Sequence, residues 1–242
     1  MTRTALVTGG SRGIGRATAL ALADDGLDVA ITYRSSADAA DAVVEEIAGR
    51  GRRAIAIQSD QSNTGQTAAA VDRTAQEFGG LDVVVLNAGV AEGRPLPDAD
   101  DELYDHIMDT NVKGVFAAAR AASHHLGEGG RIVVLGSINA DVAFVPGMTL
   151  YATSKAAVQG MVRGLAHDFA AQGTTVNAVQ PGPVDTDMNP ADGPMAEMLT
   201  PMVALKRYGR AEEIAALVRF LASEESSYIT GAALTIDGGV TV

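Results

Sequence analysis

The chain has 242 residues, of which 47% are hydrophobic and 20% charged, with a formal net charge of −12 and no cysteine. This surplus of negative charge repels nucleic acid and anionic membrane surfaces, and the lack of cysteine excludes disulfide bonds and thiolate chemistry. The length suits one large domain, and no linker, fixed-period repeat or low-complexity run divides it. We therefore expect a single domain over residues 1–242.

The first residues, MTRTALVTGG, reach a strand-like apolar run too early to hold the charged and apolar regions of a signal peptide. No uninterrupted apolar run approaches the roughly 18 residues that a membrane-spanning helix needs. The sequence therefore predicts a soluble, cytoplasmic protein with neither a membrane nor a nucleic acid as its partner.

Short β-rich runs alternate with longer alanine-rich segments of helical period. The predicted strands are 4–8, 28–33, 53–57, 81–86, 131–136, 174–179 and 233–237. The predicted helices are 13–25, 37–50, 64–78, 100–125, 150–172 and 211–222. Continuous rather than alternating apolar runs are typical of strands covered on both faces. The pattern predicts a doubly wound α/β domain with a seven-stranded parallel sheet.

Glycine or hydrogen-bonding residues follow six of the seven predicted strands, as GGSRGIG, RSS, QSD, NAG, SIN and QPG. In an open parallel sheet, ligands bind outside the carboxyl ends of the strands. Loops are polar in any case, which accounts for QSD but poorly for GGSRGIG. We therefore expect a ligand site at this edge of the sheet.

The run TGGSRGIG lies directly after the first strand and before an apolar helix. Gly9 can adopt the left-handed conformation of a tight turn, and Gly13 and Gly15 leave no side chain between the helix N-terminus and a phosphate. The free amides and the positive end of the helix dipole can then hold a pyrophosphate. The spacing G-x-x-x-G-x-G differs from the usual dinucleotide fingerprint G-x-G-x-x-G, and taken alone such a cluster also fits an ordinary glycine turn.

The motifs TGGSRGIG, NAG at 87–89, Asn111, Ser137, YATSK at 151–155 and PG at 181–182 occur in the order found in the short-chain dehydrogenase/reductase family. The resemblance covers essentially the whole chain and is nearest to the 3-oxoacyl reductases. The segment QPGPVDTDMNPADGP also resembles a bacterial subgroup that includes a cyclic-di-GMP-linked biofilm-dispersal protein. The resemblance implies a Rossmann-like fold, a nicotinamide dinucleotide, and hydride transfer to or from a carbonyl or alcohol carbon.

Tyr151 and Lys155 are four residues apart in a predicted helix, so their side chains are neighbours on one face. An ammonium about 5 Å from a phenol favours the phenolate by roughly two pKa units at an effective dielectric near 20. We therefore expect the pKa of Tyr151 to be lowered towards neutrality, where general acid catalysis is efficient. Such a pair can also simply lie along a surface, and the resemblance favours catalysis.

Two further residues complete the expected catalytic set. Ser137, at the end of the fifth strand, can donate a hydrogen bond to the substrate oxygen, or can cap the turn there. The resemblance implies that Asn111 holds a water linking Lys155 to solvent. Ser137 and Tyr151 are fourteen residues apart, about one more than in the oxoacyl reductases. We expect the loop between them to shape a different substrate pocket.

The end of the second strand bears on the choice of cofactor, because an NAD site usually has a carboxylate there. Here the chain reads Tyr33, Arg34, Ser35, and Arg12 is available in the glycine loop. Two guanidinium groups suit the ribose phosphate of NADPH, although Arg34 could instead be a solvated loop residue. The predicted NADP(H)-binding residues, some by resemblance, are Gly9, Ser11, Arg12, Gly13, Ile14, Gly15, Arg34, Ser35, Asp60, Gln61, Asn87, Ala88, Gly89, Tyr151, Lys155, Pro181, Gly182, Val184 and Thr186.

We expect no metal site, because the adjacent His124 and His125 point in different directions and no carboxylate pattern completes a ligand set. Proline and glycine favour a mobile lid at about 187–208, whose methionines suit either an adaptable lid or core. The acidic cluster at 98–102 complements the N-terminus of the next helix.

The substrate is expected to be a small carbonyl or alcohol, and the family usually forms homotetramers. Acyl carrier protein is an unlikely partner, because the arginines that dock it near the entrance in the oxoacyl reductases are Glu128 and Gln172 here. A regulatory, cyclic-di-GMP-type nucleotide binder is the alternative function.

Overall fold

The structure is a computed structural model that describes residues 2–242. A seven-stranded sheet in the order β3-β2-β1-β4-β5-β6-β9, with every pair parallel, forms its centre. The strands are β1 Thr4–Val7, β2 Asp28–Tyr33, β3 Ala54–Gln58, β4 Val83–Leu86, β5 Arg131–Leu135, β6 Thr175–Pro181 and β9 Ala233–Ile236. The predicted doubly wound α/β fold and all seven predicted strands are confirmed.

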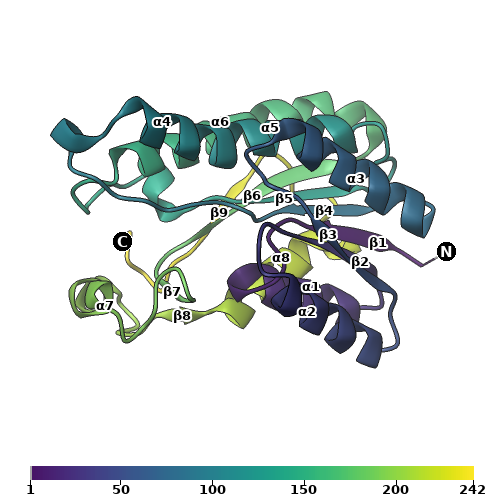
Figure 1. Cartoon of the computed structure of the whole chain (residues 1–242), viewed down its shortest axis with the longest axis horizontal. Helices are drawn as coiled ribbons and strands as arrows, with labels where there is room; N and C mark the ends of the chain where they lie inside the picture. Colours follow the sequence, from purple (N-terminus) through teal and green to yellow (C-terminus); the bar gives the residue numbers. More distant parts are fainter. Residues whose placement is uncertain (1) are drawn as a thin grey trace.

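Helices cover both faces of the sheet, as Figure 1 shows, with α3, α4, α5 and α6 on one side and α1, α2 and α8 on the other. The helices are α1 Gly13–Asp24, α2 Ala37–Gly49, α3 Thr64–Phe78, α4 Asp101–Met108, α5 Gly114–Ala122, α6 Thr149–Asp168, α7 Pro194–Leu199 and α8 Ala211–Ala222. Each face has its own apolar core, one around Leu6, Val84 and Ile132 and the other around Val7, Val83 and Val133. Adjacent strand residues thus face opposite cores, which explains the continuous apolar runs.

The helix expected over 100–125 is interrupted. A π-helical turn over Asp109–Lys113 separates α4 from α5, and it places Asn111 where a regular helix would not. The expected helix 150–172 ends at Asp168, followed by a short 3₁₀ turn. The acidic cluster before α4 behaves as expected, because the carboxylate of Asp100 accepts a hydrogen bond from the amide of Leu103 at 2.9 Å and caps the helix.

Residues 182–210, between β6 and α8, leave the sheet and form a small unit at its carboxyl end. The two-residue strands β7 Val184–Asp185 and β8 Gly209–Arg210 pair in parallel, and α7 lies between them in sequence. Figure 1 shows this unit beyond the ends of β6 and β9. Within the described residues, no helix is both long and apolar enough to cross a membrane.

Candidate active site

A cavity of about 840 Å³ opens at the carboxyl ends of the strands. Strand order reverses between β1 and β4, and the loops that follow these two strands both line the cavity. This is where a doubly wound sheet leaves a crevice, because successive connections run to opposite sides. The expected ligand site therefore lies at the switch point of the sheet.

The glycine loop turns sharply after β1. Gly9 has a φ of 65°, a left-handed conformation that side chains rarely tolerate, and its amide donates to Thr32 Oγ1 at 3.0 Å. A Cβ on Gly10 would lie 2.5 Å from Ile31 Cγ2. Hydrogen bonding to β2 and close packing against its side chains thus hold the loop in place.

The glycines at the start of α1 have different tasks. A Cβ on Gly15 would lie 2.3 Å from the carbonyl oxygen of Gly9 and 2.5 Å from Asn87 Nδ2. Gly15 is therefore required for packing of the helix against the loop, a role that the sequence analysis did not include. Gly13 has a φ of 53°. In the described chain no side chain caps this helix, so its first amides stay open to an anion.

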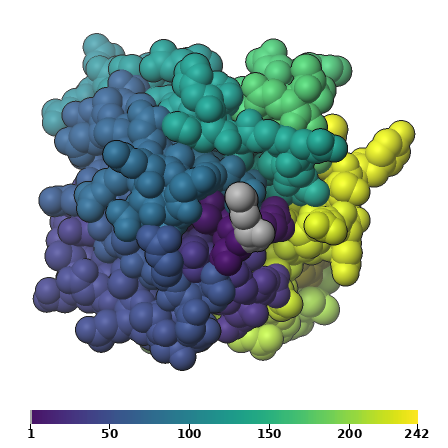
Figure 2. All heavy atoms as spheres, turned by 90° about the vertical axis from the view of Figure 1, so that its right-hand side faces the viewer, coloured from purple at the N-terminus to yellow at the C-terminus, as the bar shows by residue number. Residues whose placement is uncertain are grey.

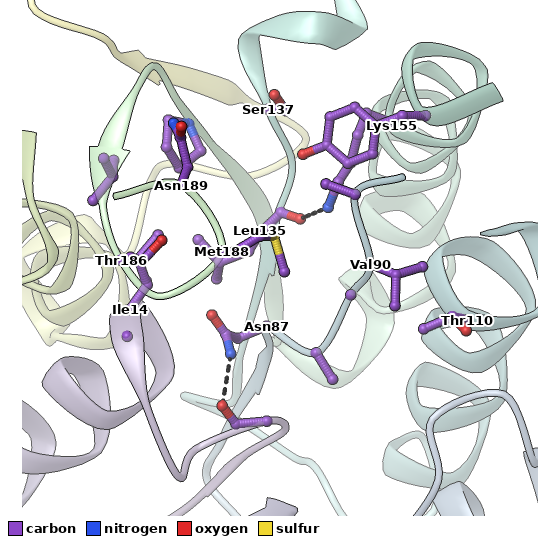
Figure 3. Close-up of a pocket in the computed structure, with 18 of the residues that line it drawn as sticks. Ile14, Asn87, Val90, Thr110, Leu135, Ser137, Lys155, Thr186, Met188 and Asn189 are labelled. Atoms are coloured by element: carbon purple, nitrogen blue, oxygen red, sulfur yellow. Dashed lines mark hydrogen bonds between the residues drawn. The ribbon is translucent and has the colours of Figure 1, made fainter. Parts of the chain in front are cut away.

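Asn87 and Thr8 join the ends of β4 and β1. The hydroxyl of Thr8 accepts hydrogen bonds from the amides of Asn87 and Ala88, both at 3.0 Å. Asn87 Nδ2 donates to the carbonyl oxygens of Thr8, at 2.9 Å, and Gly9, at 3.1 Å. Figure 3 shows Asn87 on the wall of the cavity with one of these bonds dashed. The amide group therefore holds the glycine loop as well as facing the cavity.

Charged side chains gather at one end of the cavity. Arg34 and Arg12 both line it and are exposed, and Arg12 lies 4.0 Å from Asp187 across its mouth. Asp60 lines the same end. Burial raises the pKa of Asp60, but hydrogen bonds from Ser62 and the charge of Arg34 outweigh it and leave the pKa below its usual value. This end thus offers two cations and one ionised carboxylate.

Asn111 is 1% exposed and is fully engaged with its surroundings. Its Oδ1 accepts from the amide of Val90 at 2.8 Å, and its Nδ2 donates to Val90 O at 2.9 Å and to Ser154 Oγ at 3.0 Å. Ser154 in turn donates to the carbonyl oxygen of Tyr151 at 2.7 Å. The π-helical turn therefore ties the loop after β4 to the helix that carries Tyr151 and Lys155.

Tyr151 and Lys155 lie on one face of α6, with Lys155 Nζ 5.7 Å from the centre of the Tyr151 ring. Lys155 is 7% exposed, and its Nζ donates to Leu135 O at 2.8 Å, the dashed bond beside the Leu135 label in Figure 3. Burial lowers the pKa of Lys155 to about 8. The i to i+4 pair expected from sequence is present.

The expected shift of the tyrosine is wrong for this structure. Burial raises the pKa of Tyr151, and a hydrogen bond with Ser137 opposes the rise without cancelling it. The Coulomb argument counted the ammonium but not the loss of water around the phenol, which disfavours the phenolate. Ser137, 8% exposed, also accepts from the amide of Asn139 at 3.2 Å. It thus has both of the roles considered from sequence, turn cap and hydrogen-bond partner at the site.

The other residues predicted to bind the cofactor also lie around this cavity. Gly9, Ser11, Arg12, Gly13, Ile14, Gly15, Arg34, Ser35, Asp60, Gln61, Asn87, Ala88, Gly89, Pro181, Gly182, Val184 and Thr186 all line it. Gly182 is needed for a further close approach, because a Cβ there would lie 2.7 Å from Asp237 Cα. Thr186 lies opposite Gly13, whose added Cβ would meet Thr186 Cγ2 at 3.4 Å.

The cavity has two halves of different character. We call the lining residues of 9–15, 32–36, 59–61 and 87–89 the glycine-loop half, and those of 90–95, 138–148 and 188–199 the lid half. Met188, Met195 and Phe144 in the lid half are 62%, 38% and 36% exposed. The methionines therefore face the cavity and solvent, which supports the lid and not the core alternative.

Glu128 and Gln172 are not at the cavity mouth of this subunit. They precede β5 and β6, and the amide of Gly129 donates to Gly173 O at 3.2 Å, which brings the two segments together. Figure 2 shows this face, the amino-terminal edge of the sheet, where purple, teal and yellow segments meet. The expectation that these positions border the entrance is wrong within this chain, because parallel strands place all their starts opposite the ligand edge.

Sequence reasoning missed several residues of the site. Thr8, Thr32 and Ser154 hold the glycine loop and Asn111 through side-chain hydrogen bonds. Thr8 lies in TGGSRGIG and Ser154 lies in YATSK, so the sequence signal for each is its place inside a motif of the site. Arg94 and Met148 in the lid half had no such signal, because loops bring them to the cavity.

A family model described as "Enoyl-(Acyl carrier protein) reductase" matches residues 9–241. A cyclic-di-GMP-binding biofilm dispersal mediator protein of Escherichia coli K12 is 44% identical over 98% of this chain and 96% of that protein. The 3-oxoacyl-[acyl-carrier-protein] reductase FabG of Staphylococcus aureus is 39% identical over 99% of this chain and 98% of that protein.

A solved short chain dehydrogenase from Burkholderia cenocepacia J2315, in complex with NADP, has a TM-score of 0.98 to this structure. The two sequences are 51% identical, and the match covers 99% of this chain and 98% of the Burkholderia cenocepacia chain. These likenesses extend over the whole sheet and over both halves of the cavity. They bear on the chemistry of the site as well as on the fold.

Proposed function

The chain belongs to the short-chain dehydrogenase/reductase family, and on that premise we propose that it reduces a ketone or aldehyde carbonyl to an alcohol with hydride from NADPH. Proteins of this family are oxidoreductases, and this chain is one of them. The observation that carries the proposal is the convergence of Ser137, Tyr151 and Lys155 on one cavity that also holds an open helix N-terminus.

The cofactor is NADP(H), as in the solved relative from Burkholderia cenocepacia. The residues present fit it. The uncapped start of α1 suits a pyrophosphate, and the exposed guanidinium groups of Arg12 and Arg34 suit a ribose phosphate. When bound, NADPH supplies the hydride that reduces the substrate carbon. Asp60, Asn87 and Thr186 line the cavity where the adenine, a ribose and the nicotinamide carboxamide would be held.

The chain's own residues manage the oxygen and the proton. Ser137 donates a hydrogen bond to the carbonyl oxygen, where negative charge develops as the carbon is reduced. The Tyr151 hydroxyl then transfers its proton to that oxygen. The raised pKa of Tyr151 keeps it protonated at neutral pH, ready to act as the acid. Lys155, whose pKa is about 8, is mainly an ammonium at neutral pH and stabilises the phenolate left behind.

Asn111 acts by position. Its hydrogen bonds to Val90 and Ser154 fix the loop after β4 relative to α6. A Cβ on Gly89 would lie 3.1 Å from Asn111 Oδ1 and 3.7 Å from Lys155 Nζ, so the amide oxygen and the ammonium both lie beside Gly89. We place the water that restores the proton through Lys155 in this region.

The test is a screen of NADPH oxidation against a panel of ketones and aldehydes. Turnover of at least one carbonyl, lost in Tyr151→Phe, is the expected result. If the wild type oxidises NADPH with no carbonyl and no alcohol reduces NADP⁺, the oxidoreductase chemistry proposed here is wrong.

A second candidate function is nucleotide sensing, favoured by the 44% identity to the cyclic-di-GMP-binding mediator protein. Arg12 and Arg34 would contact the phosphates of such a ligand. Binding of cyclic-di-GMP measured by calorimetry, with and without saturating NADPH, tests this. Competition between the two would place the ligand in the glycine-loop half, and absence of binding would reject the sensing function.

Two partner expectations also belong to the proposal. A homotetramer is supported by exposed aromatic residues on α4 and α5, Tyr104 and Phe116, at 46% and 48% exposure, and light scattering would test it. Acyl carrier protein is disfavoured by the net charge of −12, since the carrier is also acidic. The kcat/KM for one β-ketoacyl group on the carrier and on a small thioester would test this, and a salt-sensitive preference for the carrier would contradict it.

A further inference from the structure

Three chain segments form the walls of the lid half and contact one another. The amide of Arg94 donates to Gly147 O at 3.0 Å, and a Cβ on Gly93 would lie 2.8 Å from Met148 Sδ, so the first two walls touch. Val145 packs against the apolar cluster of Ala196, Leu199 and Tyr208, which joins the second wall to the third. The lid half is therefore a continuous pocket wall, although its segments are distant in sequence.

The lining of this wall is mainly apolar and adaptable. Met188, Met195 and Phe144 expose much of their surface in the structure, and Met148 and Leu199 also line the cavity. Figure 3 shows Met188 on the wall of the cavity, near the Leu135 label. Unbranched thioether side chains change rotamer readily and so fit apolar groups of varied shape. An apolar ligand would cover surface that is now exposed to water.

Within residues 2–242, the walls of the lid half offer no unpaired cationic side chain to a substrate. Among residues 2–242, Arg94 is the one charged side chain that its three walls contribute to the cavity. Its guanidinium lies 3.0 Å from Glu92 and 3.0 Å from Asp100, so the three side chains carry a net charge of −1. Lys155 lines the cavity from α6 and does not belong to these walls, and its Nζ donates to Leu135 O beside Tyr151. A substrate carboxylate or phosphate would find no unpaired cation on these walls.

From these walls we infer that the substrate is an uncharged ketone or aldehyde with a bulky apolar group, and that the Glu92–Arg94–Asp100 cluster discriminates against anionic substrates. This rests on the proposed carbonyl reduction. Ser137 and Tyr151 hold the carbonyl oxygen, and the apolar group lies against Phe144, Met188 and Met195. The Glu92–Arg94–Asp100 cluster has two carboxylates and one guanidinium, so it repels anions.

Matched substrate pairs test the charge rule. Ethyl benzoylformate and benzoylformate have the same reacting carbonyl but differ in charge, as do ethyl acetoacetate and acetoacetate. We expect kcat/KM to favour each ester by about tenfold at low salt, because one unbalanced carboxylate repels the anion. The preference should shrink as salt rises. Equal or faster reduction of the acids would overturn the inference.

Two variants test whether the Glu92–Arg94–Asp100 cluster causes the preference for esters over acids. Glu92 is an exposed loop residue whose carboxylate contacts Arg94, whereas Asp100 also caps α4, so Glu92→Gln is the safer change. It should raise kcat/KM for benzoylformate by roughly fivefold and leave the ester within twofold. Glu102→Gln removes the same charge from the exposed first turn of α4, away from the cavity lining. An equal gain of kcat/KM for benzoylformate in Glu102→Gln would show that the Glu92–Arg94–Asp100 cluster is not the cause.

A size series tests the apolar wall. In a series of unbranched methyl ketones, kcat/KM should rise about three- to fourfold per added methylene until the pocket is filled. Met188→Gln should flatten this rise. Met202→Gln is the matched control, because Met202 is 43% exposed but does not line the cavity. A slope unchanged in Met188→Gln, or a flat slope in the wild type, would contradict the apolar wall.

The two levels of the proposal fail differently. If neither these compounds nor the wider panel of ketones and aldehydes oxidises NADPH, and no alcohol reduces NADP⁺, carbonyl reduction itself is rejected and the substrate class falls with it. If ketones are reduced but acids and esters react alike, or small ketones react as fast as large ones, the reductase function stands and the substrate class is wrong.

Discussion

The two halves of the cavity are built in contrasting ways. In the glycine-loop half, backbone conformation and hydrogen bonds fix each element, as at Gly9, Asn87 and Thr8. In the lid half, apolar contacts and one ion cluster join segments with exposed methionines. The first half is preorganised for a ligand of fixed shape, and the second can adjust to its occupant. Mutations should therefore separate cofactor binding from substrate selection.

The largest effect should come from Tyr151→Phe, because Tyr151 borders both halves of the cavity. The change removes the proton donor but keeps the ring, so turnover should fall by about a thousandfold or more. Affinity for NADPH, measured by fluorescence titration, should stay within threefold. Activity within a few-fold of the wild type would reject Tyr151 as the acid, and a large loss of NADPH affinity would mean that the halves are not separable there.

Gly15→Ala should break the glycine-loop half by sterics. The new Cβ would lie 2.3 Å from Gly9 O, and overpacking of this kind costs roughly 3 kcal/mol. We expect a lower melting temperature and weaker NADPH binding. Gly49→Ala is the matched control, because nothing lies within 4 Å of a Cβ at this helical glycine. Equal effects of the two changes would show that the close approach at Gly15 is not what matters.

Lys155 gives the protein a pH-dependent stability. Its pKa is lowered by burial to about 8, below the ordinary value of 10.5, so the cost of burying its charge is present below pH 8. As pH rises from about 8 to 10.5, the folded state loses this proton first and stability increases, by at most roughly 3 kcal/mol. Lys155→Met should remove the increase, measured as the free energy of unfolding in urea.

The raised pKa of Tyr151 acts in the opposite sense and at higher pH. Above pH 10 the unfolded phenol ionises before the folded one, so this group lowers stability there. Tyr151→Phe should therefore keep the increase between pH 8 and 10 and reduce the loss above it. A wild-type stability that already falls between pH 8 and 9.5 would contradict the assignment to Lys155.

The smallest of these effects should come from Arg34→Ala. In the proposed mode of cofactor binding the Arg34 guanidinium contacts the ribose phosphate, so NADPH affinity should fall by about 10- to 100-fold and NADH affinity by less than threefold. Arg73→Ala controls for the change in net charge, because Arg73 is on α3 and does not line the cavity. Equal losses for both cofactors would show that Arg34 supports the loop and does not read the phosphate.

The sequence by itself determined the sheet and the edge of the sheet at which the cavity lies. Continuous apolar runs separated by helical periodicity are enough to predict parallel strands covered on both faces, and polar residues after those runs must then meet at one edge. Tyr151 and Lys155 could be paired because their spacing places them on one helix face. In each case the prediction depended on local geometry, which a short stretch of sequence specifies.

Only the tertiary structure decided the rest, because burial and long-range packing are not local. It reversed the direction of the Tyr151 pKa shift, since the loss of water around the phenol depends on the whole pocket. It gave Gly15 a packing role against Gly9 and Asn87. It placed Glu128 and Gln172 at the far edge of the sheet, and it brought the segment that carries Arg94 against Gly147, from a loop more than fifty residues away.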